Sequence, residues 1–165
     1  MLITHLSQMA VLAGEREEEN DRFNSFLKEQ PQDTIDEWVT NLNHSVEPQI
    51  DCTDCGNCCK SLMINVTEAE ADSLAEHLHQ SRTAFDAHHI EKGSNGMMIM
   101  NTIPCHFLTD NKCTVYTHRF AGCREFPGLH LPGFTKRLFS VFMHYDRCPI
   151  IFNVVEELKI KTGFK

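Results

Sequence analysis

Cysteine is absent from the first 51 residues of this chain, although the 165-residue sequence contains eight cysteines. Four of them lie within the short stretch Cys52–Cys59. The complete set is Cys52, Cys55, Cys58, Cys59, Cys105, Cys113, Cys123 and Cys148. Every thiol therefore belongs either to this stretch or to the later part of the chain that must fold back onto it.

A targeting leader and a long apolar run are not expected either. Residues 1–14 have no basic leader and are interrupted by His5, Ser7 and Gln8, and residues 15–19 are mostly acidic. This pattern fits neither a signal peptide nor a membrane span. We expect a cytoplasmic protein, in which closely spaced cysteines indicate metal ligation and not disulfides.

The chain has no overall positive charge. Its formal net charge is −8, with the acidic excess in residues 1–59 and a basic excess in residues 112–165. Nucleic acid is not expected as a partner, because the total is acidic and the cations are not interleaved with aromatic residues. Four thiols adjoin a cation, which would offset thiolate charge and lower thiol pKa, although ordinary surface scatter is the alternative. These pairs are Cys59-Lys60, Lys112-Cys113, Cys123-Arg124 and Arg147-Cys148.

Recognisable catalytic patterns are missing as well. The sequence contains no Ser-His-Asp spacing, no framed pair of carboxylates and no His-Glu-x-x-His pattern. A metal-dependent enzyme, or an accessory subunit of a modifying enzyme, is the alternative to a metal-binding module. A nucleophilic Cys58 or Cys59, activated by Lys60, belongs to that alternative.

The composition and periodicity predict an α+β fold. Hydrophobic residues make up 41% and charged residues 23%, as in a globular protein with its own core. We expect an N-terminal helical segment, residues 1–47, that packs on a cysteine-cluster metal-binding domain, residues 48–165, with short β-hairpins and several helices. The expected elements are helices in 2–29 and around 34–42, a strand at 62–66, helices at 68–80 and 83–92, a strand at 97–103, a hairpin over 104–116, a strand at 138–144 and a last helix from Cys148-Pro149.

Helix caps and the single tryptophan add details. Thr34 and Thr67 each precede a glutamate at capping-box spacing. Trp38 lies on the apolar stripe of its helix, so we expect it in the core.

The spacing of the thiols suggests two metal sites. Cys52, Cys55 and Cys58 repeat the Cys-x-x-Cys step, as in ferredoxins, where a distant Cys-Pro such as Cys148-Pro149 supplies the fourth ligand. Neighbouring side chains usually point apart, so Cys59 is expected outside this set. It could join Cys105, Cys113 and Cys123 in a second site, or be buried. With a single site, the remaining thiols would serve packing or redox chemistry.

The cysteine pattern resembles that of the YkgJ-type cysteine-cluster family, also known as the zinc- or iron-chelating CxxCxxCC domain. The similarity starts at Cys52 and ends at Cys148-Pro149. It includes Pro104-Cys105, Phe107-Leu108, Cys113, Val115-Tyr116, Arg119, Cys123-Arg124 and Phe126-Pro127. One departure is Phe120, where the family usually has proline.

The resemblance implies bound zinc or an iron–sulfur centre held by the eight cysteines. A related cysteine block occurs in flagellin lysine methylases, but no strand-linked Gly-rich loop for their cofactor is found here. Thiolates suit both metals, and the ferredoxin-like spacing favours a [4Fe–4S] cluster. We expect a structural, redox or electron-transfer module that works with a protein partner or self-associates through its N-terminal helices.

Overall fold

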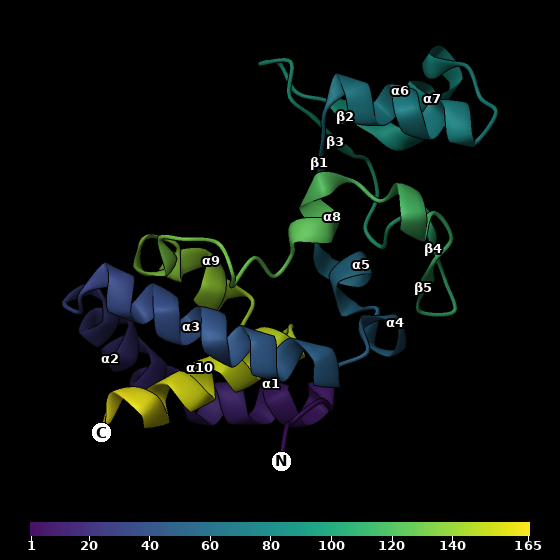
Figure 1. Ribbon diagram of the computed structural model, residues 1–165. Coiled ribbons are helices and arrows are strands. Elements are labelled where there is room, and N and C mark those ends of the chain that lie inside the picture. The colour runs from purple at the N-terminus through teal and green to yellow at the C-terminus, as the bar shows by residue number, and fades with distance from the viewer. The chain divides into compact units, whose positions relative to one another are not determined.

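The computed structural model describes residues 1–165, and its contacts divide them into two units (Figure 1). Residues 1–51 and 127–165 form the first, which we call the helical unit. Residues 52–126 form the second, which we call the cysteine unit. Ten α-helices and two small antiparallel sheets confirm the predicted α+β fold.

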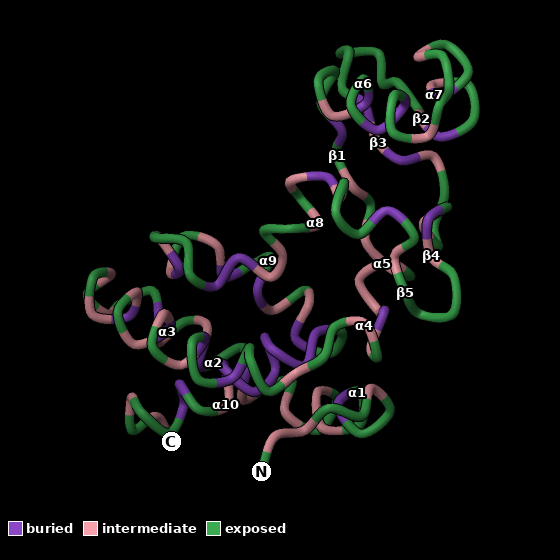
Figure 2. Tube along the Cα trace, turned by 45° about the vertical axis from the view of Figure 1, so that its right-hand side comes forward, coloured by how far each residue is buried: buried purple, intermediate pink, exposed green.

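The helical unit is organised around its C-terminal helix. Its elements are α1 (Leu6–Glu15), α2 (Glu17–Lys28), α3 (Gln32–Val46), the 3₁₀ turns η1 (Glu47–Gln49) and η3 (Phe134–Lys136), α9 (Leu138–Met143) and α10 (Pro149–Thr162). Nine residues of α10 are buried, and the helix packs against α3 and α1 (Figure 2). Proline at its first position and Gly163 in a left-handed C-cap delimit it, which confirms the predicted last helix.

Polar contacts tie other segments to this helical core. Asn153 of α10 accepts a hydrogen bond from Ile3 N at 2.9 Å and donates one to Ile3 O at 2.8 Å. Asp36 of α3 accepts from Gly133 N and Phe134 N at 2.7 and 2.8 Å. Residues distant in sequence thus share one core.

Two local predictions in the helical unit are wrong. Residues 138–144 were expected as a strand but form α9, whose Leu138 and Val141 are buried at helical spacing. The expected capping box at Thr34 is absent because the helix begins at Gln32, directly after Pro31. Trp38, which was expected in the core, is only half-buried, and Lys161 Nζ lies 5.4 Å from its ring centroid.

The contacts also place residues 127–165 with the N-terminal helices. This grouping differs from the predicted division after residue 47, because α10 packs on α3. The domain boundary at residue 47 stays a prediction, since compact units of contacts do not test independent folding.

The cysteine unit consists of short elements. They are α4 (Cys52–Cys55), α5 (Asn57–Ser61), β1 (Asn65–Val66), α6 (Glu68–His77), α7 (Arg82–His89), β2 (Ile90–Lys92), β3 (Met98–Met100), β4 (Leu108–Thr109), β5 (Lys112–Cys113), the 3₁₀ turn η2 (Tyr116–His118) and α8 (Ala121–Glu125). One sheet has the order β1-β3-β2, with β3 antiparallel to both neighbours, and the other is the β4–β5 hairpin.

The apolar core of this unit lies between the three-stranded sheet and the helices α6 and α7. Leu74, Phe85, Met98 and Met100 are among its buried residues, so two methionines of the predicted strand pack in the core, whereas Met97 is exposed. The expected helix over 83–92 ends at His89, because residues 90–92 pair with β3.

Candidate metal centre

The first cysteines lie on two short helices separated by Gly56. Gly56 has φ 55°, and its N–H donates to Cys52 O at 2.9 Å. A Cβ at this position would lie 3.0 Å from Asn111 O. Glycine is therefore required both for the left-handed turn and for the close approach to the β4–β5 hairpin.

The hairpin brings two further thiols to this segment. Asp110 and Asn111 both have positive φ, as a two-residue hairpin turn demands, and Leu108 pairs with Cys113. Cys105 N donates to Cys59 O at 2.8 Å. The predicted hairpin is thus confirmed, and backbone bonds hold its start beside the cysteine helices.

Helix α8 supplies Cys123 and is anchored from α6. The predicted capping box at Thr67 is present, with Thr67 N donating to Glu70 Oε2 at 2.9 Å. The other carboxylate oxygen of Glu70 accepts from Ala121 N at 2.6 Å, in the first turn of α8. Phe120, where the family usually has proline, is buried and has φ −58°, which proline would also adopt. The turn is therefore kept despite the departure.

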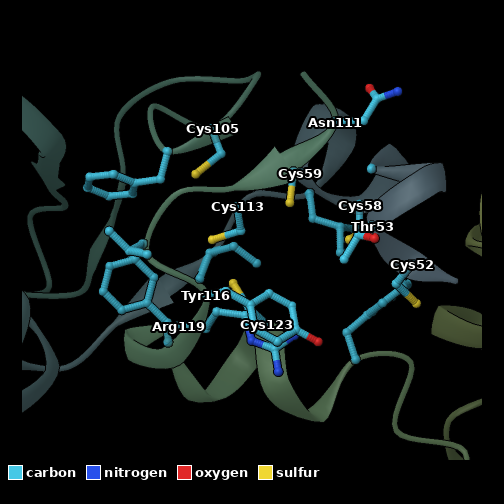
Figure 3. Close-up of a pocket in the computed structure, with 17 residues that line it drawn as sticks. Cys52, Thr53, Cys58, Cys59, Cys105, Asn111, Cys113, Tyr116, Arg119 and Cys123 are labelled. Atoms are coloured by element: carbon cyan, nitrogen blue, oxygen red, sulfur yellow. The ribbon is translucent and has the colours of Figure 1, made fainter. Parts of the chain in front are cut away.

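Six of the eight thiols line one cavity of about 80 Å³ within the cysteine unit. They belong to Cys52, Cys58, Cys59, Cys105, Cys113 and Cys123. In the close-up, the sulfurs of Cys59, Cys105, Cys113 and Cys123 face a common space, whereas Cys52 lies at the edge (Figure 3). Apolar side chains such as Ile64, Phe107 and Phe120 form the remaining wall.

The cavity thiols perturb one another electrostatically. A hydrogen bond from Cys58 to Cys59 raises the pKa of Cys58, with burial adding to it, and lowers the pKa of Cys59. Burial raises the pKa of Cys105, and it raises that of Cys123 to about 12, with repulsion from the neighbouring thiols adding in both cases. These thiols cannot all ionise without a compensating cation.

This donor set fits a thiolate-bound metal. A bound cation reverses the unfavourable charge and deprotonates its thiols. Four thiolates complete either a tetrahedral zinc site or one [4Fe–4S] cluster. No three histidine, cysteine, aspartate or glutamate side chains of the chain stand close enough to hold an ion in this conformation, so the cavity thiols would have to turn towards one another to bind a metal.

The structure brings together one of the two predicted ligand sets. Cys59, Cys105, Cys113 and Cys123 all line the cavity. Cys58 also lines it and hydrogen-bonds to Cys59, which the rule that neighbouring side chains point apart did not anticipate.

The other predicted set is not gathered within one unit. Cys52 and Cys58 line the cavity but Cys55 does not, and Cys148 is buried at the N-cap of α10 in the helical unit. That set stays a prediction.

Two cavity residues were not singled out as functional from the sequence. Arg119 and Tyr116 line the cavity, and the Arg119 guanidinium carbon lies 3.7 Å from the Tyr116 ring centroid. Their spacing carries no recognisable motif. The one available signal is that both belong to the block of residues that carries the family resemblance.

A family model described as "Putative zinc- or iron-chelating domain" (CxxCxxCC) matches residues 51–148. No curated protein and no solved structure matches the chain. None of its helices combines the length and apolarity needed to cross a bilayer. The family match covers more than half of the sequence and includes every cavity thiol, so the chain belongs to the CxxCxxCC family of zinc- or iron-chelating domains.

Proposed function

We propose that the cysteine unit holds a metal centre through the thiolates of Cys59, Cys105, Cys113 and Cys123. The supporting observation is that these four thiols, which come from four separate segments, face one cavity. Thiolates from separate segments act as a crosslink when a metal binds them, as in other structural sites.

The centre that we propose is structural or redox-active and not catalytic by itself. Catalytic zinc usually keeps a position open beside three protein ligands, whereas here at least four thiols surround the space. Zinc would stabilise the fold, and an iron–sulfur cluster would in addition carry an electron.

The spacing of the second predicted set of thiols favours one metal over the other in this proposal. Cys52, Cys55 and Cys58 have ferredoxin-like spacing, and Cys148 precedes a proline. We therefore favour iron–sulfur over zinc, in a reducing cytoplasm, with a protein partner that exchanges electrons with the centre or is organised by it.

Metal analysis of full-length protein, produced and purified without oxygen, tests the proposal. We expect iron and sulfide, with absorbance near about 400 nm that dithionite bleaches. Stoichiometric zinc without iron would contradict the iron–sulfur assignment and leave the thiolate centre intact.

Two variants separate the ligand sets. Cys113→Ser removes a cavity thiol, and Cys55→Ser removes a thiol that lies outside the cavity wall. Cys113→Ser should lower the metal content by the amount held in the cavity. An unchanged metal content in Cys113→Ser would contradict the cavity site, whatever Cys55→Ser does.

A further inference from the structure

The cavity wall contains one cation whose position is fixed. Arg119 is half-buried, and its guanidinium stacks on the Tyr116 ring at 3.7 Å. Its Nε is buried without a hydrogen-bond partner. The Arg124 guanidinium donates to the Arg119 carbonyl, which holds the backbone that carries this side chain.

No carboxylate neutralises Arg119. The ion pairs within the cysteine unit are those of Arg82 and Lys92, which pair with Glu68, Asp72 and Asp86. A guanidinium stays charged at physiological pH, and a cation withdrawn from water needs a compensating negative charge. Arg119 lines the cavity together with the thiols, and although burial raises the pKa of Cys123, the charge of Arg119 acts in the opposite direction and favours its thiolate form.

We propose that Arg119 is a positioning residue of the metal centre, and that its guanidinium, fixed by Tyr116, balances the negative charge of the metal–thiolate group. This inference rests on the proposed function. Four thiolates around a dication leave a net charge of about −2, which a neighbouring cation stabilises. Arg119 therefore strengthens zinc binding, and beside an iron–sulfur cluster it stabilises the more negative, reduced state.

The test is the zinc affinity of the full chain after reduction and removal of metal, measured by competition with a chromophoric chelator. Arg119→Gln should weaken zinc binding about tenfold, the effect of one charge in a partly screened site. Lys60→Gln is the matched control, because Lys60 adjoins Cys59 in sequence but is exposed and outside the cavity wall. It should change the affinity less than about twofold.

The conservative variant separates charge from packing. Arg119→Lys keeps the charge and should retain the affinity within about threefold, whereas a packing role would make it as weak as Arg119→Gln. The inference would be overturned if Arg119→Gln and Lys60→Gln lost zinc affinity equally, or if Arg119→Gln lost none. In either case, zinc binding by the wild type would still uphold the proposed function. If circular dichroism shows that Arg119→Gln does not fold, the pair Arg119→Lys and Tyr116→Leu replaces it as the test. Tyr116→Leu keeps the charge of Arg119 but removes the ring that fixes its position, so it should weaken zinc binding measurably. A wild type that binds no zinc and no iron would contradict both proposals.

Discussion

The two units of this chain are stabilised by different means. In the helical unit, α10 alone contributes nine buried residues, and Lys159 within it forms ion pairs with Glu19 and Glu156, both at 2.8 Å. In the cysteine unit, the helices α4, α5 and α8 have no buried residue. Apolar burial can hold the first unit without help, whereas the cysteine-bearing helices need another source of stability, which the proposed metal centre would supply.

Removal of the metal should produce the largest difference between the units. After chelation, we expect α4, α5 and α8 to lose hydrogen-exchange protection, because these helices have no buried residue and the proposed thiolate–metal bonds would be what fixes them. The amides of α10 should keep their protection. Hydrogen exchange followed by mass spectrometry measures both at once, and equal loss in the two units would contradict the contrast.

A large-to-small substitution in α10 should act on the helical unit regardless of metal. Leu158 is fully buried, so Leu158→Ala should lower the free energy of unfolding by about 2–5 kcal/mol. Denaturant titration followed by the fluorescence of Trp38, the single tryptophan, measures this with and without metal. Ile160→Ala is the control, since Ile160 is 74% exposed and should cost less than about 0.5 kcal/mol. A loss that appears only in metal-loaded protein would argue against a self-sufficient helical core.

A substitution at the turn between α4 and α5 should act on the cysteine unit. Gly56→Ala forces a Cβ into a left-handed turn, 3.0 Å from Asn111 O, at a cost of about 1–2 kcal/mol from the turn alone. We expect a corresponding loss of zinc affinity. Gly14→Ala in α1 meets nothing within 4 Å, so it should leave zinc affinity unchanged and stabilise the helix by about 1 kcal/mol. Unaltered zinc binding by Gly56→Ala would mean that the cysteine segment is not preorganised.

The contact between α6 and α8 should depend on pH. Burial raises the pKa of Glu70, but hydrogen bonds from Ala121 and Thr67 outweigh it, so the pKa lies below the ordinary value of 4.5. The charged form therefore adds stability above pH 4.5, and this contribution is lost as the pH falls through the lowered pKa. Glu70→Gln should cost about 1 kcal/mol at neutral pH, and this difference should shrink as the pH falls through the lowered pKa. The denaturant midpoints of the wild type and of Glu70→Gln, measured across this pH range, check the prediction, since loss of metal in acid affects both proteins alike. A difference in midpoint that persists in acid would contradict it.

The sequence predicted the elements whose signals are local. The capping box at Thr67, the hairpin turn at Asp110 and Asn111 and the last helix after Cys148 are all present. The same capping pattern failed at Thr34, because the helix has its N-cap at Pro31, three residues earlier than the box requires. The apolar run 138–144 was too short for its period to separate helix from strand.

Features that depend on tertiary contacts were not accessible from the sequence. The packing of α10 on α3 joins segments more than 100 residues apart, and no local pattern encodes it. The same is true of the cavity. Spacing suggested which four thiols could share a site, but neither the orientation of Cys58 nor the stacking of Arg119 on Tyr116 follows from spacing.

The coordination shell of the metal tests the central claim most directly. X-ray absorption at the metal edge of full-length protein should show a shell of four sulfurs, at about 2.3 Å if the metal is zinc. In Cys113→Ser, the sulfur count of the cavity metal should fall, or that metal should be lost. A wild-type shell made mainly of nitrogen and oxygen, or a sulfur shell that Cys113→Ser leaves unchanged, would contradict a metal centre built from the cavity thiols.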